Sequence, residues 1–268
     1  MKITRKKFLK LGLMGGAGLA LPLGTLSIPA SRLGTAASVR SPSVEPFRVP
    51  LPIPPVLKPA RTDGTTDRYE IVQKAAMQEI LPGKKTEIWG YEGLFPGPTI
   101  QARSGRRVER RQWNELPVPV STHLHGGVTP PDSDGYPTDL ILHRGYEHEH
   151  GHEHGTHMPV GEHGHMFKDY GYPNGQRAAT LWYHDHRMDF TGPQVYKGLL
   201  GVYVLRDDVE DSLPLPTGDK DVPLVITDRT FREDGSFYYP SIDPTLREPG
   251  VLASATNLAY SGVFGDTV

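Results

Sequence analysis

Short runs of β-forming residues, punctuated by proline and glycine, constrain the fold of this chain more than any other feature. The 268 residues include 30 Gly and 26 Pro, and no long helical period competes with the strand pattern. Strand-like runs occupy residues 69–80, 86–91, 99–113, 122–125, 178–184, 198–205 and 223–227. Short strands with turn signals at this spacing predict an all-β protein, built as an antiparallel sandwich or barrel.

The composition excludes several classes of function. The sequence contains no cysteine, which removes disulfides, thiolate metal sites and cysteine nucleophiles together. Any metal must therefore be held by histidine and carboxylate side chains. The net charge of −2 is close to balanced, so there is no electrostatic case for binding nucleic acid or an acidic membrane surface.

Residues 1–37 have the organisation of an export signal. A basic segment from Arg5 to Lys10 precedes an apolar run over residues 11–23 and small residues near Ala36. Residues 4–10 also resemble a twin-arginine signal whose second arginine is replaced by lysine; an ordinary secretory signal or a retained anchor is the alternative. The apolar run is shorter than the roughly 20 residues that span a bilayer. We therefore expect an exported protein (periplasmic, extracellular or at the cell surface) without a permanent membrane span.

Residues 38–67 are predicted to form an extended arm over the domain surface. The seven prolines within residues 41–60 rule out a regular helix or a central strand there. The strand pattern begins after this arm, at Arg68.

The histidines are concentrated in one part of the chain. All 12 lie between His123 and His186, and eight of them fall within residues 143–165. In this stretch histidine alternates with glutamate and glycine, which leaves no apolar face and predicts a surface loop. The loop either gathers copper or zinc near a site, or is a solvated insertion that binds metal only incidentally.

Two His-X-His pairs lie outside that loop, each within a strand-like run. Residues i and i+2 of a strand point to the same face, so His123 and His125 are expected to project together, as are His184 and His186. A single pair on a strand is more often structural. Two matched pairs, one on each of two neighbouring strands, predict a face that binds a cluster of metal ions.

The residues around these pairs resemble the first cupredoxin domain of a multicopper oxidase, of the bacterial three-domain branch with spore-coat laccases, bilirubin oxidases and phenoxazinone synthases. The resemblance covers residues 68–268. It is carried by Leu-Phe-Pro-Gly-Pro-Thr-Ile at 94–100, Thr-His-Leu-His-Gly-Gly at 122–127, Ser-Asp-Gly-Tyr-Pro at 133–137, Leu-Trp-Tyr-His-Asp-His at 181–186 and Gly-Leu-Leu-Gly-Val-Tyr at 198–203. It implies a cupredoxin-like Greek-key β-barrel over residues 68–208, including the His-rich loop.

The resemblance also implies a chemistry. Family members pass electrons from a small aromatic reductant through a type 1 copper to a trinuclear cluster, where dioxygen is reduced to water. By resemblance, His123 is a ligand of the type 2 copper, while His125, His184 and His186 are ligands of the type 3 coppers. Asp134 matches an acidic position near the cluster that could transfer protons; a plain turn residue is the alternative.

The sequence departs from the family in one important respect. A type 1 copper needs a cysteine thiolate, and this chain has neither a cysteine nor a histidine after His186. The chain is therefore expected to carry half of a trinuclear copper site. Residues 209–268 resemble the incomplete start of a second cupredoxin domain, which suggests a truncated or split gene product.

Two hypotheses remain open. The first is a laccase-like oxidoreductase acting on phenols, aminophenols or bilirubin-like tetrapyrroles, of which this chain is the N-terminal portion and a missing C-terminal half is a partner. On this hypothesis the isolated chain is expected to be inactive. The second is a non-catalytic exported copper-binding protein.

Overall fold

The computed structural model describes residues 41–143 and 167–239, and nearly all of its regular structure is β-strand. The predicted export signal and most of the predicted His-rich loop lie outside the described residues. The described helices are short: Pro131–Ser133 (η2), Thr191–Lys197 (α3), Asp208–Asp211 (α4) and Gly218–Lys220 (η3). None of them is long and apolar enough to cross a membrane.

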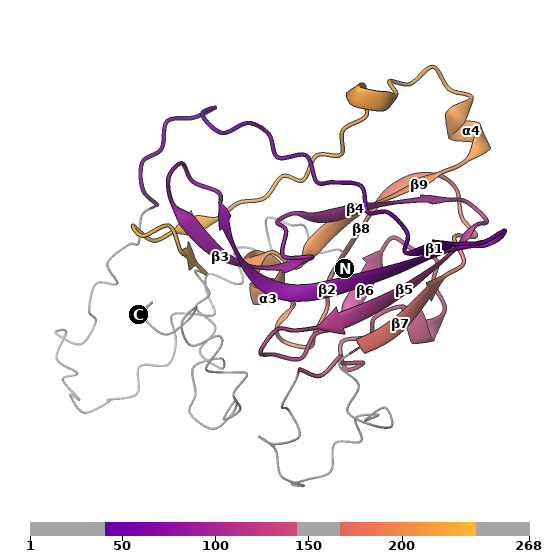
Figure 1. Cartoon of the computed structure of the whole chain (residues 1–268), viewed down its shortest axis with the longest axis horizontal. Coiled ribbons are helices and arrows are strands. Elements are labelled where there is room, and N and C mark those ends of the chain that lie inside the picture. The colour runs from indigo at the N-terminus through magenta and orange to yellow at the C-terminus, as the bar shows by residue number, and fades with distance from the viewer. Residues whose placement is uncertain (1–40, 144–166, 240–268) are drawn as a thin grey trace, which may run out of the picture. The chain divides into compact units, whose positions relative to one another are not determined.

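Two sheets make up the domain (Figure 1). The first contains β1 (Arg61–Thr62), β2 (Thr66–Glu79), β3 (Lys85–Tyr91), β5 (Arg107–Asn114) and β7 (Phe167–Tyr172). Its order is β1-β2-β5-β7, with β3 also paired to β2. The second contains β4 (Gly97–Arg103), β6 (Thr122–His125), β8 (Ala179–Asp185) and β9 (Leu200–Arg206), in the order β4-β9-β8-β6. A small hairpin joins Thr230–Phe231 (β10) to Phe237–Tyr238 (β11).

The all-β prediction is confirmed, but one expected strand is in fact two. The run over residues 99–113 is divided at Ser104 and Gly105 into β4 and β5, which belong to different sheets. Gly105 has a φ of +75°, a left-handed conformation that glycine adopts at low cost, and Arg106 N–H donates to Arg103 O across the turn. Strand β2 runs parallel to β5 and β4 runs parallel to β9, so the sheets are mixed and not purely antiparallel.

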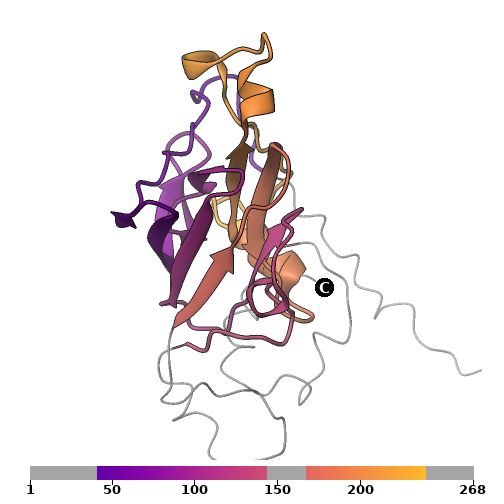
Figure 2. The same ribbon diagram turned by 90° about the vertical axis from the view of Figure 1, so that its right-hand side faces the viewer.

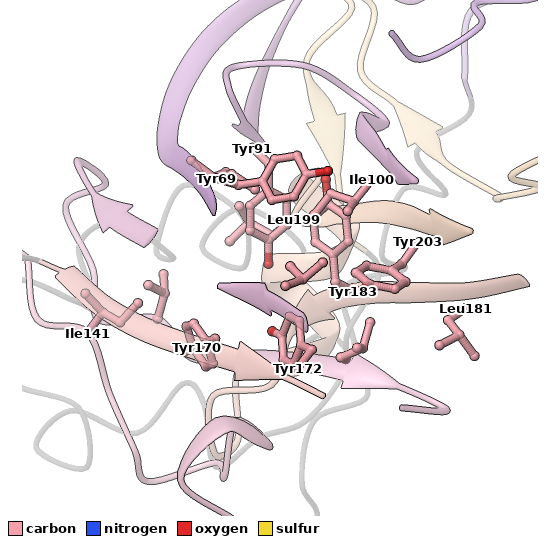
Figure 3. Packing of buried hydrophobic residues seen from close by; sticks show 14 of the residues in the cluster. Tyr69, Tyr91, Ile100, Ile141, Tyr170, Tyr172, Leu181, Tyr183, Leu199 and Tyr203 are labelled. Atoms are coloured by element: carbon pink, nitrogen blue, oxygen red, sulfur yellow. The ribbon is translucent and has the colours of Figure 1, made fainter. Parts of the chain in front are cut away.

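The hydrophobic core lies between the two sheets, which stand beside each other as separate layers in Figure 2. Every second side chain of each strand points into this core, where it packs against side chains of the other sheet. Figure 3 shows Tyr91 of β3 beside Tyr183 of β8, with ring centroids 4.7 Å apart and the rings edge to face. The Tyr183 hydroxyl also donates to Pro98 O at 2.5 Å. Leu124 of β6 and Leu181 of β8 point into this core, so the residues on either side of them point out of it.

The segments before and after the barrel are described only in part. Within the predicted arm, Val56 forms a parallel bridge with Thr99 at the edge of β4. The run at residues 223–227 is not a strand, contrary to expectation, because its backbone has no strand partner within the described residues. The predicted boundaries of the arm, of the first domain and of the second domain remain predictions.

Candidate metal centre

The two His-X-His pairs lie on adjacent strands of the second sheet. Strands β6 and β8 are antiparallel neighbours, with His123 opposite His184 and His125 opposite Trp182. Leu124 is buried in the core, so His123 and His125 project from the outer face of the sheet. Trp182 and His184 share that face, because Leu181 and Tyr183 point inward. The fold therefore brings both pairs to one surface of the domain.

Three of the four imidazoles converge tightly. Each of His123, His125 and His184 offers a ring nitrogen, and these nitrogens all lie within 4.8 Å of one another. The ring centroids are 5.5 Å apart for His123 and His125, and 5.6 Å apart for His123 and His184. His186 follows the last residue of β8, and its ring centroid is 5.2 Å from that of His123. The structure thus places His186 next to these three rings, although it is not among the residues whose ligand atoms all lie within 4.8 Å of one another.

Backbone carbonyls set the tautomers of two of these rings. The Nδ1 atom of His123 lies 2.6 Å from Asp134 O, and the Nδ1 atom of His184 lies 2.7 Å from Asp185 O. A carbonyl oxygen only accepts, so each Nδ1 must carry the proton and donate. The Nε2 atom of both rings is then left with a free lone pair, which is the form that binds a metal ion. His184 Nε2 lies 3.3 Å from His125 Nδ1.

The environment keeps the more buried imidazoles neutral. Desolvation by burial lowers the pKa of His184 to about 4, and the neighbouring histidines add to this effect. Burial, followed by the charge of His123, also lowers the pKa of His186. Neutral imidazole is the metal-binding form, so at neutral pH both side chains are available as ligands.

Asp134 lies next to His123, on the loop that follows η2. Its carboxylate accepts a hydrogen bond from the Thr129 hydroxyl at 2.8 Å, and Oδ1 lies 3.5 Å from His123 Nδ1. The following residue, Gly135, has a φ of +73°, and a Cβ there would overlap the carbonyl oxygen of Thr122. The glycine therefore allows the loop to approach β6 closely enough to bring Asp134 to the cluster.

The residue between the second pair, Asp185, was not predicted from the sequence to belong to the site. Its buried carboxylate accepts from Ser121 N–H at 3.0 Å and from Arg187 N–H at 3.1 Å, which links the chain on either side of the site. Burial raises the pKa of Asp185 to about 7. The sequence shows only that Asp185 lies between two histidines. This position does not reveal which backbone groups its carboxylate binds.

Comparison with known proteins gives a consistent result. Residues 73–210 match the family model described as multicopper oxidase. A laccase from Bacillus subtilis (strain 168) is 39% identical over 241 residues, which cover 78% of this chain and 44% of the laccase. A bilirubin oxidase from Albifimbria verrucaria is 36% identical over 205 residues, which cover 73% of this chain and 32% of the oxidase. The chain thus spans less than half the length of these relatives.

A solved structure agrees with the sequence relatives. The crystal structure of a laccase from Pediococcus acidilactici Pa5930 matches with a TM-score of 0.61 and 30% sequence identity. The match covers 75% of this chain and 39% of that structure. Together with the two sheets described above, it confirms the predicted cupredoxin-like fold.

Proposed function

The chain belongs to the multicopper oxidase family, and on that premise we propose that its two His-X-His pairs form half of a trinuclear copper site. The observation that carries the proposal is the convergence of three imidazole nitrogens within 4.8 Å on the outer face of a sheet. The donor set fits copper, because imidazole is a good ligand for copper ions. Two of the rings also have the tautomer that presents Nε2.

The proposed roles follow the sequence prediction. His123 is the ligand of the type 2 copper, while His125, His184 and His186 are ligands of the type 3 coppers. Copper, when bound, supplies one-electron transfer between an organic reductant and dioxygen. The protein holds the imidazoles in fixed planes, and the Asp134 carboxylate beside His123 accepts and passes on protons at this edge of the site.

We propose that the complete enzyme is laccase-like and oxidises phenolic or tetrapyrrole substrates with dioxygen. The relatives named above are a laccase and a bilirubin oxidase. Because the sequence contains no cysteine, no thiolate of this chain can hold a type 1 copper. In this proposal the remaining ligands come from a further polypeptide segment, and the 268-residue chain alone does not turn over substrate.

The absence of cysteine also favours a second candidate, a non-catalytic exported copper-binding protein. The two candidates differ in what happens when a C-terminal half of a family laccase is joined to the chain. Oxygen consumption with a phenolic substrate supports the oxidase, whereas copper binding without turnover in the joined protein supports the second candidate.

Copper binding itself is tested on the full chain by competition titration with Cu²⁺. The wild type is expected to bind copper at the cluster, and His123→Ala and His184→Ala are each expected to weaken that binding. Gln78→Ala, in strand β2 of the other sheet, serves as the control. If both histidine variants bind copper like the wild type, the cluster is not the copper site.

A further inference from the structure

We propose that Trp182 is a positioning residue, which sets the planes of one imidazole from each His-X-His pair. This inference rests on the proposed function, since it concerns the side chains that would hold copper. Its basis is a ring arrangement across β6 and β8 that the sequence does not reveal.

The indole ring of Trp182 stacks on two histidines at once. Its centroid is 4.1 Å from that of His184, with an interplanar angle of 28°, and 5.2 Å from that of His125, with an angle of 29°. The two stacking contacts arise from two different positions relative to Trp182. His184 is two residues along β8 and therefore on the same face, whereas His125 is directly opposite Trp182 on β6. One side chain thus contacts both strands of the site.

The two histidines depend on this contact to different degrees. His184 has a second constraint, because its Nδ1–H donates to Asp185 O at 2.7 Å. Within the described residues, the only hydrogen bond of the His125 ring is the 3.3 Å contact with His184. The indole is therefore the main group that fixes the plane of His125. Losing it would free a ring whose nitrogen must face those of His123 and His184.

The other surroundings of Trp182 are mostly apolar. It lines a pocket of about 510 Å³ together with Val202 of β9, Val195 and Tyr196 of α3, and residues 223–229. The Trp182 side chain therefore stands between this pocket and the two imidazoles. A planar aromatic ring at this position stacks on both imidazoles, although 36% of the Trp182 residue remains exposed.

The experiment compares Trp182→Phe, which keeps a planar ring, with Trp182→Leu, which keeps apolar bulk only. Both are made in the full chain, and Cu²⁺ is added in competition titrations and for electron paramagnetic resonance. We expect Trp182→Leu to lower copper affinity about 10-fold and to alter the copper hyperfine splitting. Trp182→Phe is expected to restore most of the affinity and the wild-type spectrum. Trp113→Leu is the matched control, because Trp113 contacts Phe167 in the other sheet, with ring centroids 4.7 Å apart and an interplanar angle of 50°.

A metal-free measurement keeps the inference testable if Trp182→Leu does not fold. In the wild type, NMR should show the ring protons of His125 and His184 shifted upfield by the indole, and Trp182→Phe should reduce this shift. Unshifted ring protons in the wild type overturn the inference. So does a folded Trp182→Leu chain with wild-type affinity and spectrum, and that outcome leaves copper binding intact. Loss of the proposed function is recognised separately, when His123→Ala and His184→Ala bind copper like the wild type.

Discussion

His123 and His184 stand directly opposite each other across the β6–β8 pair, with ring centroids 5.6 Å apart. Each donates its Nδ1–H to a backbone carbonyl, so Nε2 of each ring is unprotonated. The two strands therefore each direct the Nε2 atom of one imidazole toward the same place on the surface. The relationship depends on register, because a shift of one residue would turn one ring into the core.

The burial of His184 should make the metal-free chain sensitive to acid. The unfolded chain takes up this proton near pH 6.5, whereas the folded chain does so only near the lowered pKa of about 4. Stability is therefore lost as the pH falls from 6.5 towards 4, by up to about 3 kcal/mol. The free energy of unfolding, measured at pH 7.5 and 4.5 with a chelator present, should fall more in the wild type than in His184→Gln.

Asp185 must be considered in the same experiment, because its contribution has the opposite sign. Its folded pKa of about 7 lies above the ordinary 3.8, so the folded state binds the proton first. This stabilises the fold progressively as the pH falls from 7 towards 3.8. Asp185 is present in both proteins, so the difference between wild type and His184→Gln isolates His184. Equal pH dependence in the two would contradict the prediction.

A buried arginine in the core gives a prediction about stability. Arg110 is fully buried, and its three guanidinium nitrogens have no hydrogen-bond partner within the described residues. The guanidinium lies over the rings of Tyr183 and Tyr91, at 4.6 Å and 5.2 Å from their centroids. Such contacts stabilise by about 2 kcal/mol each when desolvated, but within the described residues no carboxylate pairs with this charge, and replacing a buried charge by an apolar side chain of similar volume is often neutral or stabilising. Arg110→Met should therefore stabilise the fold by about 1–4 kcal/mol in urea unfolding.

The neighbouring arginine provides the control for this experiment. Arg111 points to the opposite face of β5, where its exposed guanidinium pairs with Asp169 at 2.8 Å. Arg111→Met should change stability by no more than about 0.5 kcal/mol. If Arg110→Met instead destabilises the fold, the tyrosine rings offset the cost of burying the charge.

Alanine substitutions at two glycines with the same backbone conformation should distinguish the cost of backbone strain from the cost of steric overlap. Gly135 and Gly105 have φ values of +73° and +75°. A Cβ at Gly105 meets nothing within 4 Å, whereas a Cβ at Gly135 would overlap Thr122 O. Gly105→Ala should cost about 1–2 kcal/mol from the left-handed conformation alone, and Gly135→Ala should cost more. Thermal unfolding of the two variants checks this, and equal losses would show that the loop at Gly135 can move away.

Gly135→Ala should also affect copper binding. The displaced loop carries Asp134, whose carbonyl oxygen accepts from His123 Nδ1. Copper affinity measured below the unfolding temperature should fall in Gly135→Ala and stay unchanged in Gly105→Ala. A folded Gly135→Ala chain with wild-type affinity would show that the carbonyl of Asp134 is not needed to orient His123.

The proposed role of Asp134 predicts a loss of turnover without a loss of metal. In the chain joined to a family C-terminal half, Asp134→Asn should lower oxygen consumption at least about 100-fold, because the amide cannot carry the proton. Copper content should stay the same. Asp132→Asn, an acidic position in η2 two residues earlier, is the control. Equal turnover in Asp134→Asn and the wild type would assign Asp134 to the turn alone.

Much of the strand pattern and the ligand content of the site could be predicted from the residues alone. Alternation along 122–125 predicted β6 at its observed bounds, because side-chain direction in a strand depends only on position along it. The two His-X-His pairs were likewise predicted to be two matched pairs of metal ligands. Strand β7, at Phe167–Tyr172, was not predicted. It begins two residues after the end of the His-rich stretch, and the composition of that stretch obscures the short strand pattern that follows.

The contacts between distant groups could not be predicted from the sequence. The turn at Gly105 separates one apparent strand into two sheets, because glycine permits a left-handed residue that strand propensity does not report. The β6–β8 register places Trp182 against His125, 57 positions earlier in the chain. The same packing leaves His186 outside the cluster of three nitrogens and encloses Arg110 among tyrosines. Periodicity fixes the face on which a side chain lies, whereas its neighbours depend on pairings between strands that are distant in the sequence.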